Sequence, residues 1–227
     1  MKYNFSKILL WIYLFVLIPL NLSGHLFDLP NLVFFSKPLL MPLLIILFFQ
    51  NTKAYASSLK VGVIGGLFFS WIGDLALMIE SVNSTFFMVG LVGFLIAHIN
   101  YIIVFNKSKA KKTEESSLKN ILIPVFGLFT LSFLILLWPH LGELRIPVII
   151  YATVLMLMGI FAVSRQPNKG FYLVLFGAIL FVISDSVLAT NKFYSTFYLA
   201  RVITMLTYTI AQLLIVLGLS KNITSKN

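Results

Sequence analysis

Long apolar runs, each bounded by charged residues or turn formers, divide the chain almost from end to end. Eight runs have about the length that a helix needs to cross the hydrocarbon core of a bilayer. They cover residues 7–22, 34–49, 60–79, 86–105, 118–138, 146–163, 170–189 and 197–219. No small-residue cleavage site follows the first run, so we interpret it as a span and not as a signal peptide. The pattern predicts an all-α fold, a polytopic membrane bundle of eight transmembrane helices in a single membrane domain over residues 1–227.

The positive charges fall mainly on one side of this eight-span arrangement. All 17 lysines and arginines lie on the side of the two termini, except for Lys37, Arg145, Lys192 and Arg201. Because lysine and arginine are enriched in cytoplasmic loops, both termini, the basic loop at 106–120 and the tail at 220–227 are predicted to be cytoplasmic. The net charge of +10 is therefore mainly a topological signal, and no nucleic-acid partner is expected.

Composition removes several classes of protein and of site. Hydrophobic residues make up 59% of the 227 residues and charged residues 11%, far from the composition of soluble domains. Cysteine is absent, which excludes disulfides, thiolate metal sites and cysteine nucleophiles. The motifs of serine hydrolases, P-loop ATPases, dinucleotide-binding folds and HExxH metalloproteases are also absent. We therefore expect neither a metal nor an organic cofactor.

The two halves of the chain share a short pattern. In the third and seventh runs a glycine lies eight residues before an aspartate and a leucine three residues after it, as in Gly66, Asp74 and Leu77, and in Gly177, Asp185 and Leu188. Four spans return a chain to its starting side, so a duplication of four spans gives a parallel repeat. The pattern predicts a four-plus-four internal repeat, with residues 1–105 as the first unit and 118–219 as the second.

Asp74 and Asp185 are the acidic residues that lie well inside predicted spans. An ionisable group at such a position is energetically unfavourable and usually functional. With a rise of 1.5 Å per residue, the two lie roughly 21 and 22 Å from the cytoplasmic ends of their helices, and so at one level of the membrane. A partly dehydrated pair of carboxylates prefers to hold one proton, which would supply both an acid and a base. The alternative is two separate carboxylates, each hydrogen-bonded within the core, for example to Ser70 or Ser184.

Further polar residues occur near the same level. Lys37 and Arg201 lie at the outer ends of their spans, where either could contact a phosphate or simply reach the head-group region, and Arg201 could instead pair with an aspartate. Tyr208 and Gln212 follow Arg201 at helical spacing and form a polar stripe. The residues expected to bind a substrate are Lys37, Ser70, His98, Asn100, Ser184, Arg201, Tyr208 and Gln212.

The order of these short motifs resembles the YhhN family of lysoplasmalogenases. The resemblance rests on Ser36-Lys37-Pro38, Met41-Pro42-Leu43, Phe69 to Leu75, Phe94 to His98 with Tyr101, Phe181 to Ser186, Tyr208, and Ala211-Gln212. It implies an eight-span hydrolase that cleaves the sn-1 vinyl ether of a lysoplasmalogen to a fatty aldehyde and glycerophosphoethanolamine or glycerophosphocholine. It also implies that Asp74 and Asp185 are the catalytic residues and that lysophospholipids and membrane lipids are the partners.

Two other functions are compatible with intramembrane carboxylates and a repeat. A proton-coupled transporter uses the same components, although Pro38, Pro42, Pro124 and Pro147 are predicted near span starts, which does not favour the interrupted helices of many carriers. A lipid-binding protein without turnover would bind lysolipid equally well after loss of one carboxylate. The absence of cysteine and of targeting signals is compatible with a bacterial cytoplasmic membrane.

Overall fold

A computed structural model shows how these runs fold, and it describes residues 5–80, 82–108 and 117–225. The described residues form helices and no β-strand. The elements are α1 (Phe5–Ile12), the π-helical turn η1 (Tyr13–Leu17), α2 (Ile18–Leu26), α3 (Pro30–Thr52), α4 (Leu59–Met78), α5 (Thr85–Lys107), α6 (Lys119–Leu137), α7 (Arg145–Val163), α8 (Phe171–Ala189), the π-helical turn η5 (Thr190–Tyr194) and α9 (Ala200–Thr224). Short 3₁₀ turns, η3 (Trp138–His140) and η4 (Gly142–Leu144), join α6 to α7.

Within the described part of the chain, eight helical segments are long and apolar enough to cross a membrane, which confirms the prediction of a multi-pass integral membrane protein. The first span combines α1, η1 and α2 into one rod over Phe5–Leu26 and is longer than the apolar run suggested. The last span runs five residues beyond its predicted end, so most of the predicted tail is helix. The lysines and glutamates at 109–116 lie outside the described residues.

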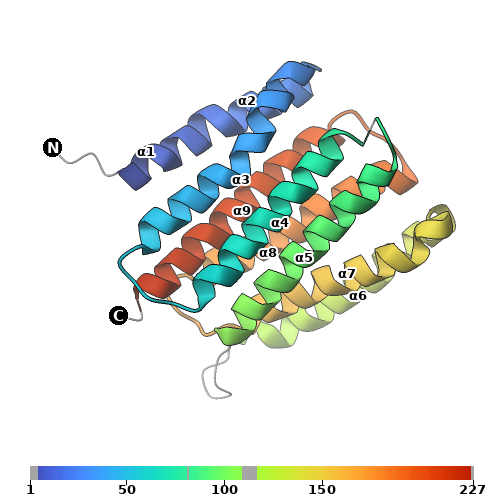
Figure 1. Cartoon of the computed structure of the whole chain (residues 1–227). Helices are drawn as coiled ribbons and strands as arrows, with labels where there is room; N and C mark the ends of the chain where they lie inside the picture. The colour runs from blue at the N-terminus through green and yellow to red at the C-terminus, as the bar shows by residue number, and fades with distance from the viewer. Residues whose placement is uncertain (1–4, 81, 109–116, 226–227) are drawn as a thin grey trace.

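The helices pack as two intimate pairs with further helices laid on them (Figure 1). α4 packs along α5, and α8 packs along α9. α3 contacts both α4 and α9, while α7 contacts both α5 and α8. A four-plus-four duplication would give this pairing, because α3 would then correspond to α7 and α5 to α9, so that the contact of α3 with α9 matches that of α7 with α5. The duplication itself stays a prediction. The first helix begins and the last ends at the same end of the bundle.

The pair α8 and α9 is brought together by glycine. A β-carbon built on Gly170 would lie 2.0 Å from the carbonyl oxygen of Gly218, so the two backbones touch at this point. Small residues are what allows membrane helices to approach so closely.

Gly170→Ala is therefore expected to lower the free energy of unfolding by about 1–3 kcal/mol, the loss typical of overpacking. If the two helices can shift apart, the loss should lie in the lower half of this range. The matched control is Gly127→Ala in α6, where a β-carbon would meet nothing within 4 Å. That change should be neutral or slightly stabilising, because alanine favours helix more than glycine does. Unfolding of both variants in detergent checks the difference, and equal stabilities would contradict the packing argument.

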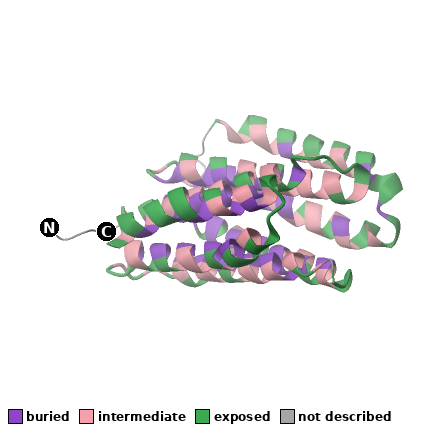
Figure 2. Ribbon diagram, turned by 90° about the horizontal axis from the view of Figure 1, so that it is seen from above, coloured by how far each residue is buried: buried purple, intermediate pink, exposed green. Residues whose placement is uncertain are grey.

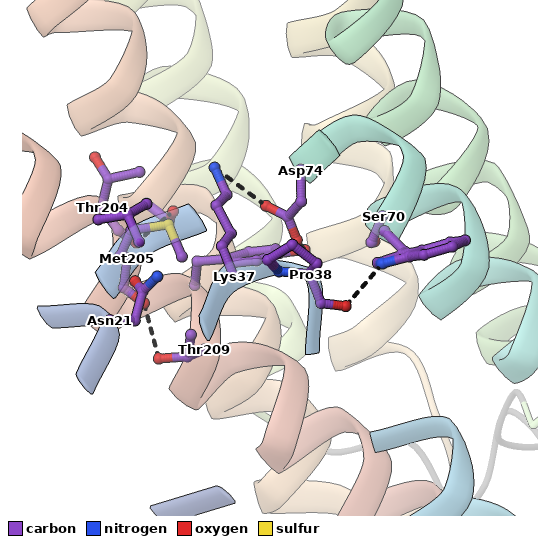
Figure 3. Close-up of polar contacts among 12 residues, drawn as sticks. Asn21, Lys37, Pro38, Ser70, Asp74, Thr204, Met205 and Thr209 are labelled. Carbon is purple, nitrogen blue, oxygen red and sulfur yellow. Dashed lines mark hydrogen bonds and ion pairs between the residues drawn. The ribbon is translucent and has the colours of Figure 1, made fainter. Parts of the chain in front are cut away.

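The prolines of α3 lie inside the helix and not near its start, which corrects the prediction for Pro38 and Pro42. A proline at position 42 cannot donate to the carbonyl four residues earlier, which is that of Pro38. The indole nitrogen of Trp71 donates to this carbonyl at 2.9 Å and replaces the missing partner. The helix stays continuous, and the contact fixes α4 against α3 beside the first aspartate (Figure 3).

Buried residues gather on the helix faces that point into the bundle, and exposed ones cover its outer faces (Figure 2). α6 is the exception among the spans, because only 11% of its apolar window is buried, against 56% for α9. α6 packs along α7 and meets α8 through side chains near its two ends: Leu122 belongs to a cluster with Phe171 and Leu175, and Leu137 to one with Ala189 and Phe193.

Candidate active site

Asp74 is held in the interior by one cation and one phenol. It lies on α4 and is 2% exposed. The ammonium group of Lys37, from α3, lies 3.6 Å from its Oδ1 (Figure 3). The hydroxyl of Tyr208, from α9, donates to its Oδ2 at 2.8 Å. Sequence reasoning predicted all three residues as site residues, and the structure brings them together from three spans.

A second layer of hydrogen bonds fixes the helices behind Asp74. The hydroxyl of Tyr101 on α5 donates to Oε1 of Gln212 at 2.6 Å, and Nε2 of Gln212 donates to the hydroxyl oxygen of Ser70 at 2.9 Å. All three side chains are fully buried. Ser70 and Gln212 were predicted to contact substrate, but here they join α4, α5 and α9 and thereby position Asp74.

Asp185 has a different set of neighbours. It lies on α8, and its Oδ2 accepts a hydrogen bond of 2.5 Å from the hydroxyl of Tyr151 on α7. Nε2 of the buried His98 on α5 lies 3.8 Å from the same oxygen, beyond hydrogen-bonding distance. Neither ring nitrogen of His98 has a hydrogen-bond partner within the described residues. Asp185 is more accessible than Asp74, with 11% of its side chain exposed.

The two aspartates have separate hydrogen-bond partners in neighbouring parts of the bundle. Among the described residues no hydrogen bond joins them, since each accepts one from a different tyrosine. The ring of Phe181 packs edge-on against both Tyr208 and His98, at centroid distances of 5.5 and 4.7 Å. The structure therefore shows two carboxylates with separate partners, and a proton shared directly between them stays a prediction.

An apolar cleft opens beside Asp185 in the gap between α6 and α8. We call it the Asp185 cleft, and its walls are Leu77 of α4, Phe87, Leu91 and Phe94 of α5, Phe129, Thr130, Phe133, Leu134 and Leu137 of α6, Val148, Tyr151, Ala152, Leu155 and Met156 of α7, and Val182, Asp185, Ser186, Leu188 and Ala189 of α8 with Phe193. The cavity volume of the cleft is small, about 60 Å³. Asp185 is the carboxylate on this wall. The space is narrow and apolar, as suits an alkyl chain.

Lys192 and Glu80 meet beside two phenylalanines of the cleft wall. Lys192, in η5, forms an ion pair with Glu80, which follows α4. Its ammonium group also lies 4.7 Å from the ring centroid of Phe87, and Phe87 packs edge-on against Phe193. Both phenylalanines belong to the cleft wall. The ion pair thus links η5 to the connection between α4 and α5.

Three of the predicted site residues lie elsewhere. Asn100 donates to the backbone of its own helix, at the carbonyl of Ile96, and its side chain lies against Gly65, away from both aspartates. Ser184 donates to the carbonyl of Thr204 at 3.0 Å and so links α8 to α9. Arg201 is exposed and lies in the first turn of α9, and none of the ion pairs among the described residues joins it to an aspartate. It lines a separate polar depression with His25, Leu26, Phe27, Asp28, Asn191, Thr196, Phe197 and Tyr198.

Tyr151 lines the Asp185 cleft and Lys192 contacts its wall, but neither residue carries a motif that would single it out. A tyrosine in an apolar span reads as packing, although its hydroxyl needs a partner when buried, and that requirement was the one available signal. Within the ranges that the structure describes, no group of three histidine, aspartate or glutamate side chains is placed to hold a metal ion.

Fold and site together define a polytopic helical membrane protein with two buried acidic centres, one of them on the wall of a narrow apolar cleft. The YhhN family matches residues 32–219, and the chain belongs to this family. The chain is also 27% identical over 182 residues to lysoplasmalogenase TMEM86B of Sus scrofa, covering 80% of the chain and 74% of that protein. No solved structure matches the chain. Family and relative support a lysoplasmalogenase-like hydrolase.

Proposed function

We propose that the protein hydrolyses the sn-1 vinyl ether bond of a lysoplasmalogen, releasing a fatty aldehyde and a glycerophospho-base, with Asp185 as the proton donor and Asp74 as its ionised partner. The observation that carries the proposal is the position of Asp185, an acid on the wall of a narrow apolar cleft in a membrane bundle. The alkenyl chain lies in the cleft. The basic residues predict cytoplasmic termini, which puts the cleft in the outer half of the membrane.

The different neighbours of the two aspartates support this division of roles. Lys37 beside Asp74 stabilises the ionised carboxylate of that residue, whereas the described residues place no lysine or arginine against Asp185. The nearby negative charge of Asp74 disfavours a second ionised carboxylate. Asp185 therefore keeps a proton that it can give, and Tyr151 holds its side chain in place.

The chemistry needs one acid, one negative charge and water. Asp185 gives its proton to the outer alkene carbon, and the π electrons form the new C–H bond while the ether oxygen shares the positive charge of an oxocarbenium ion. The negative charge of Asp74 stabilises this cation. Water adds to the cationic carbon and returns a proton to the Asp185 carboxylate, giving a hemiacetal. The hemiacetal then collapses by breaking the bond between this carbon and the glycerol oxygen, which yields aldehyde and alcohol. Carboxylate pairs divide the roles of acid and charge stabiliser in the same way on glycosidic bonds.

The test is aldehyde release by the purified protein in detergent or liposomes. Lysoplasmalogen is expected to give equal amounts of aldehyde and glycerophospho-base. The lysolipid with a saturated 1-O-alkyl chain has no vinyl ether and should remain intact, and an sn-1 ester lysolipid should release no fatty acid. Binding of lysoplasmalogen without turnover, or its transfer across the bilayer without aldehyde, would overturn the proposal.

A further inference from the structure

A cation that the proposed reaction does not use lies against the wall of the Asp185 cleft. Lys192 lies over the ring of Phe87, a residue of the cleft wall, and its side chain is 37% exposed. Its partner Glu80 is 25% exposed, so the pair is open to water and to a competing anion. Ion pairs of this kind contribute little stability, which makes exchange of one anion for another easy.

We infer that the ammonium group of Lys192 binds the phosphate of the lysolipid, and that it pairs with Glu80 when the cleft is empty. The inference rests on the proposed function, since it places the head group of that substrate. The ligand class is a phosphodiester attached to an alkyl or alkenyl chain. On binding, phosphate oxygens replace the Glu80 carboxylate at Lys192, while the chain fills the apolar cleft below.

The spacing along the chain fits this arrangement. Lys192 follows Asp185 by seven residues, which is about 10 Å of helix rise. In a lysoplasmalogen seven bonds separate the alkene carbon that accepts the proton from the phosphorus, a span of about 9 Å when extended. A substrate with its phosphate at Lys192 therefore places its vinyl ether beside Asp185.

The other cations at this end of the bundle are engaged or distant from the cleft. Lys37 is 8% exposed and already pairs with Asp74. Arg201 lines the separate polar depression. The guanidinium group of Arg145 lies 4.8 Å over the ring of Trp138, and neither residue lines the cleft.

Steady-state kinetics on two substrates test the inference. Lys192→Gln is expected to raise KM for lysoplasmalogen about tenfold with little change in kcat, because a charged hydrogen bond to the head group is lost. The same variant should leave KM unchanged for a 1-O-alkenylglycerol, which has the vinyl ether and no phosphate. Lys192→Arg should restore binding, and Arg145→Gln, a loss of charge at the same end of the bundle, should have no effect.

Glu80→Gln separates phosphate binding from a structural role of the ion pair. If Lys192 binds phosphate, removing its competitor lowers KM for lysoplasmalogen by about threefold, opposite in sign to Lys192→Gln. If the pair serves only to hold η5 in place, both variants raise KM, and they do so for both substrates. That result would overturn the inference, as would a phosphate-dependent rise in KM for Arg201→Gln with none for Lys192→Gln.

A binding measurement keeps the inference independent of turnover. The saturated 1-O-alkyl lysolipid cannot be hydrolysed as a vinyl ether, so its Kd reports binding alone. Wild-type protein is expected to bind it about tenfold more tightly than 1-O-alkylglycerol, and Lys192→Gln should abolish the difference. Loss of the difference with no aldehyde release in any variant would refute the proposed reaction and support the phosphate site. Aldehyde release without any such difference would refute the phosphate site alone.

Discussion

Replacing Asp185 by asparagine is expected to lower aldehyde release from lysoplasmalogen by a factor of about 10² to 10⁴, the usual contribution of a positioned general acid. Asparagine has nearly the same shape and still accepts the hydrogen bond from Tyr151, so the packing of α8 against α7 should survive. What it cannot do is give a proton to carbon. The loss should appear in kcat, because no contact that holds the alkyl chain has been removed.

The measurement is the initial rate of aldehyde formation by wild type and variant at equal concentrations of folded protein. Folding is checked by the thermal unfolding midpoint in detergent and by retained binding of the saturated 1-O-alkyl lysolipid. Glu143→Gln makes the same chemical change at an exposed position of η4 and should leave the rate within about twofold, as expected for a surface substitution. A folded Asp185→Asn protein with full activity would remove Asp185 from the reaction.

The membrane spans were predictable because the length of each apolar run can be read from the sequence, and the bilayer sets the length that a span needs. The apolar run at 60–79 forms α4, Leu59–Met78, and Asp74 is buried in it. Lys37, Tyr208 and Asp74 were each predicted as site residues, and their meeting follows from three inward-facing polar groups in a membrane bundle, where such groups seek one another.

The rotation of each helix about its own axis was less predictable. A membrane helix is apolar on all sides, so a single polar residue does not show which face points inward. Asn100 and His98 are two residues apart and therefore point in different directions, one toward Gly65 and the other toward Asp185. Nothing in the local sequence distinguishes them, because the choice depends on which helix packs against each face.

Lateral neighbours were equally hidden. The Asp185 cleft has walls from both α6 and α8, two helices that are distant in sequence. The ion pair of Lys192 with Glu80 joins residues 112 positions apart. Periodicity reports on one helix at a time, so contacts of this kind appear only once the bundle is assembled.

Lys37→Met is expected to lower the free energy of unfolding by about 3–5 kcal/mol, the loss typical of breaking a buried ion pair by removing one partner. Lys37 is 8% exposed and Asp74 2%, so the carboxylate left behind would have no water and no cation to replace the ammonium group. Methionine has nearly the same length and flexibility as lysine and should fill the space on α3. The loss therefore reports on charge and not on a cavity.

A second substitution separates the pair from the residues themselves. Lys37→Met combined with Asp74→Asn removes both charges and keeps the acceptor for the hydroxyl of Tyr208, so more than half of the lost stability should return. The matched control is Lys192→Met, which also breaks an ion pair, but one in which both partners reach water. It should change the free energy of unfolding by at most about 1 kcal/mol. Equilibrium unfolding in mixed micelles gives the free energies of unfolding of the wild type, Lys37→Met, the double variant and Lys192→Met. If Lys37→Met is as mild as Lys192→Met, or if the double variant is less stable than Lys37→Met alone, Lys37 does not neutralise Asp74, and the assignment of Asp74 as the ionised carboxylate loses its physical basis.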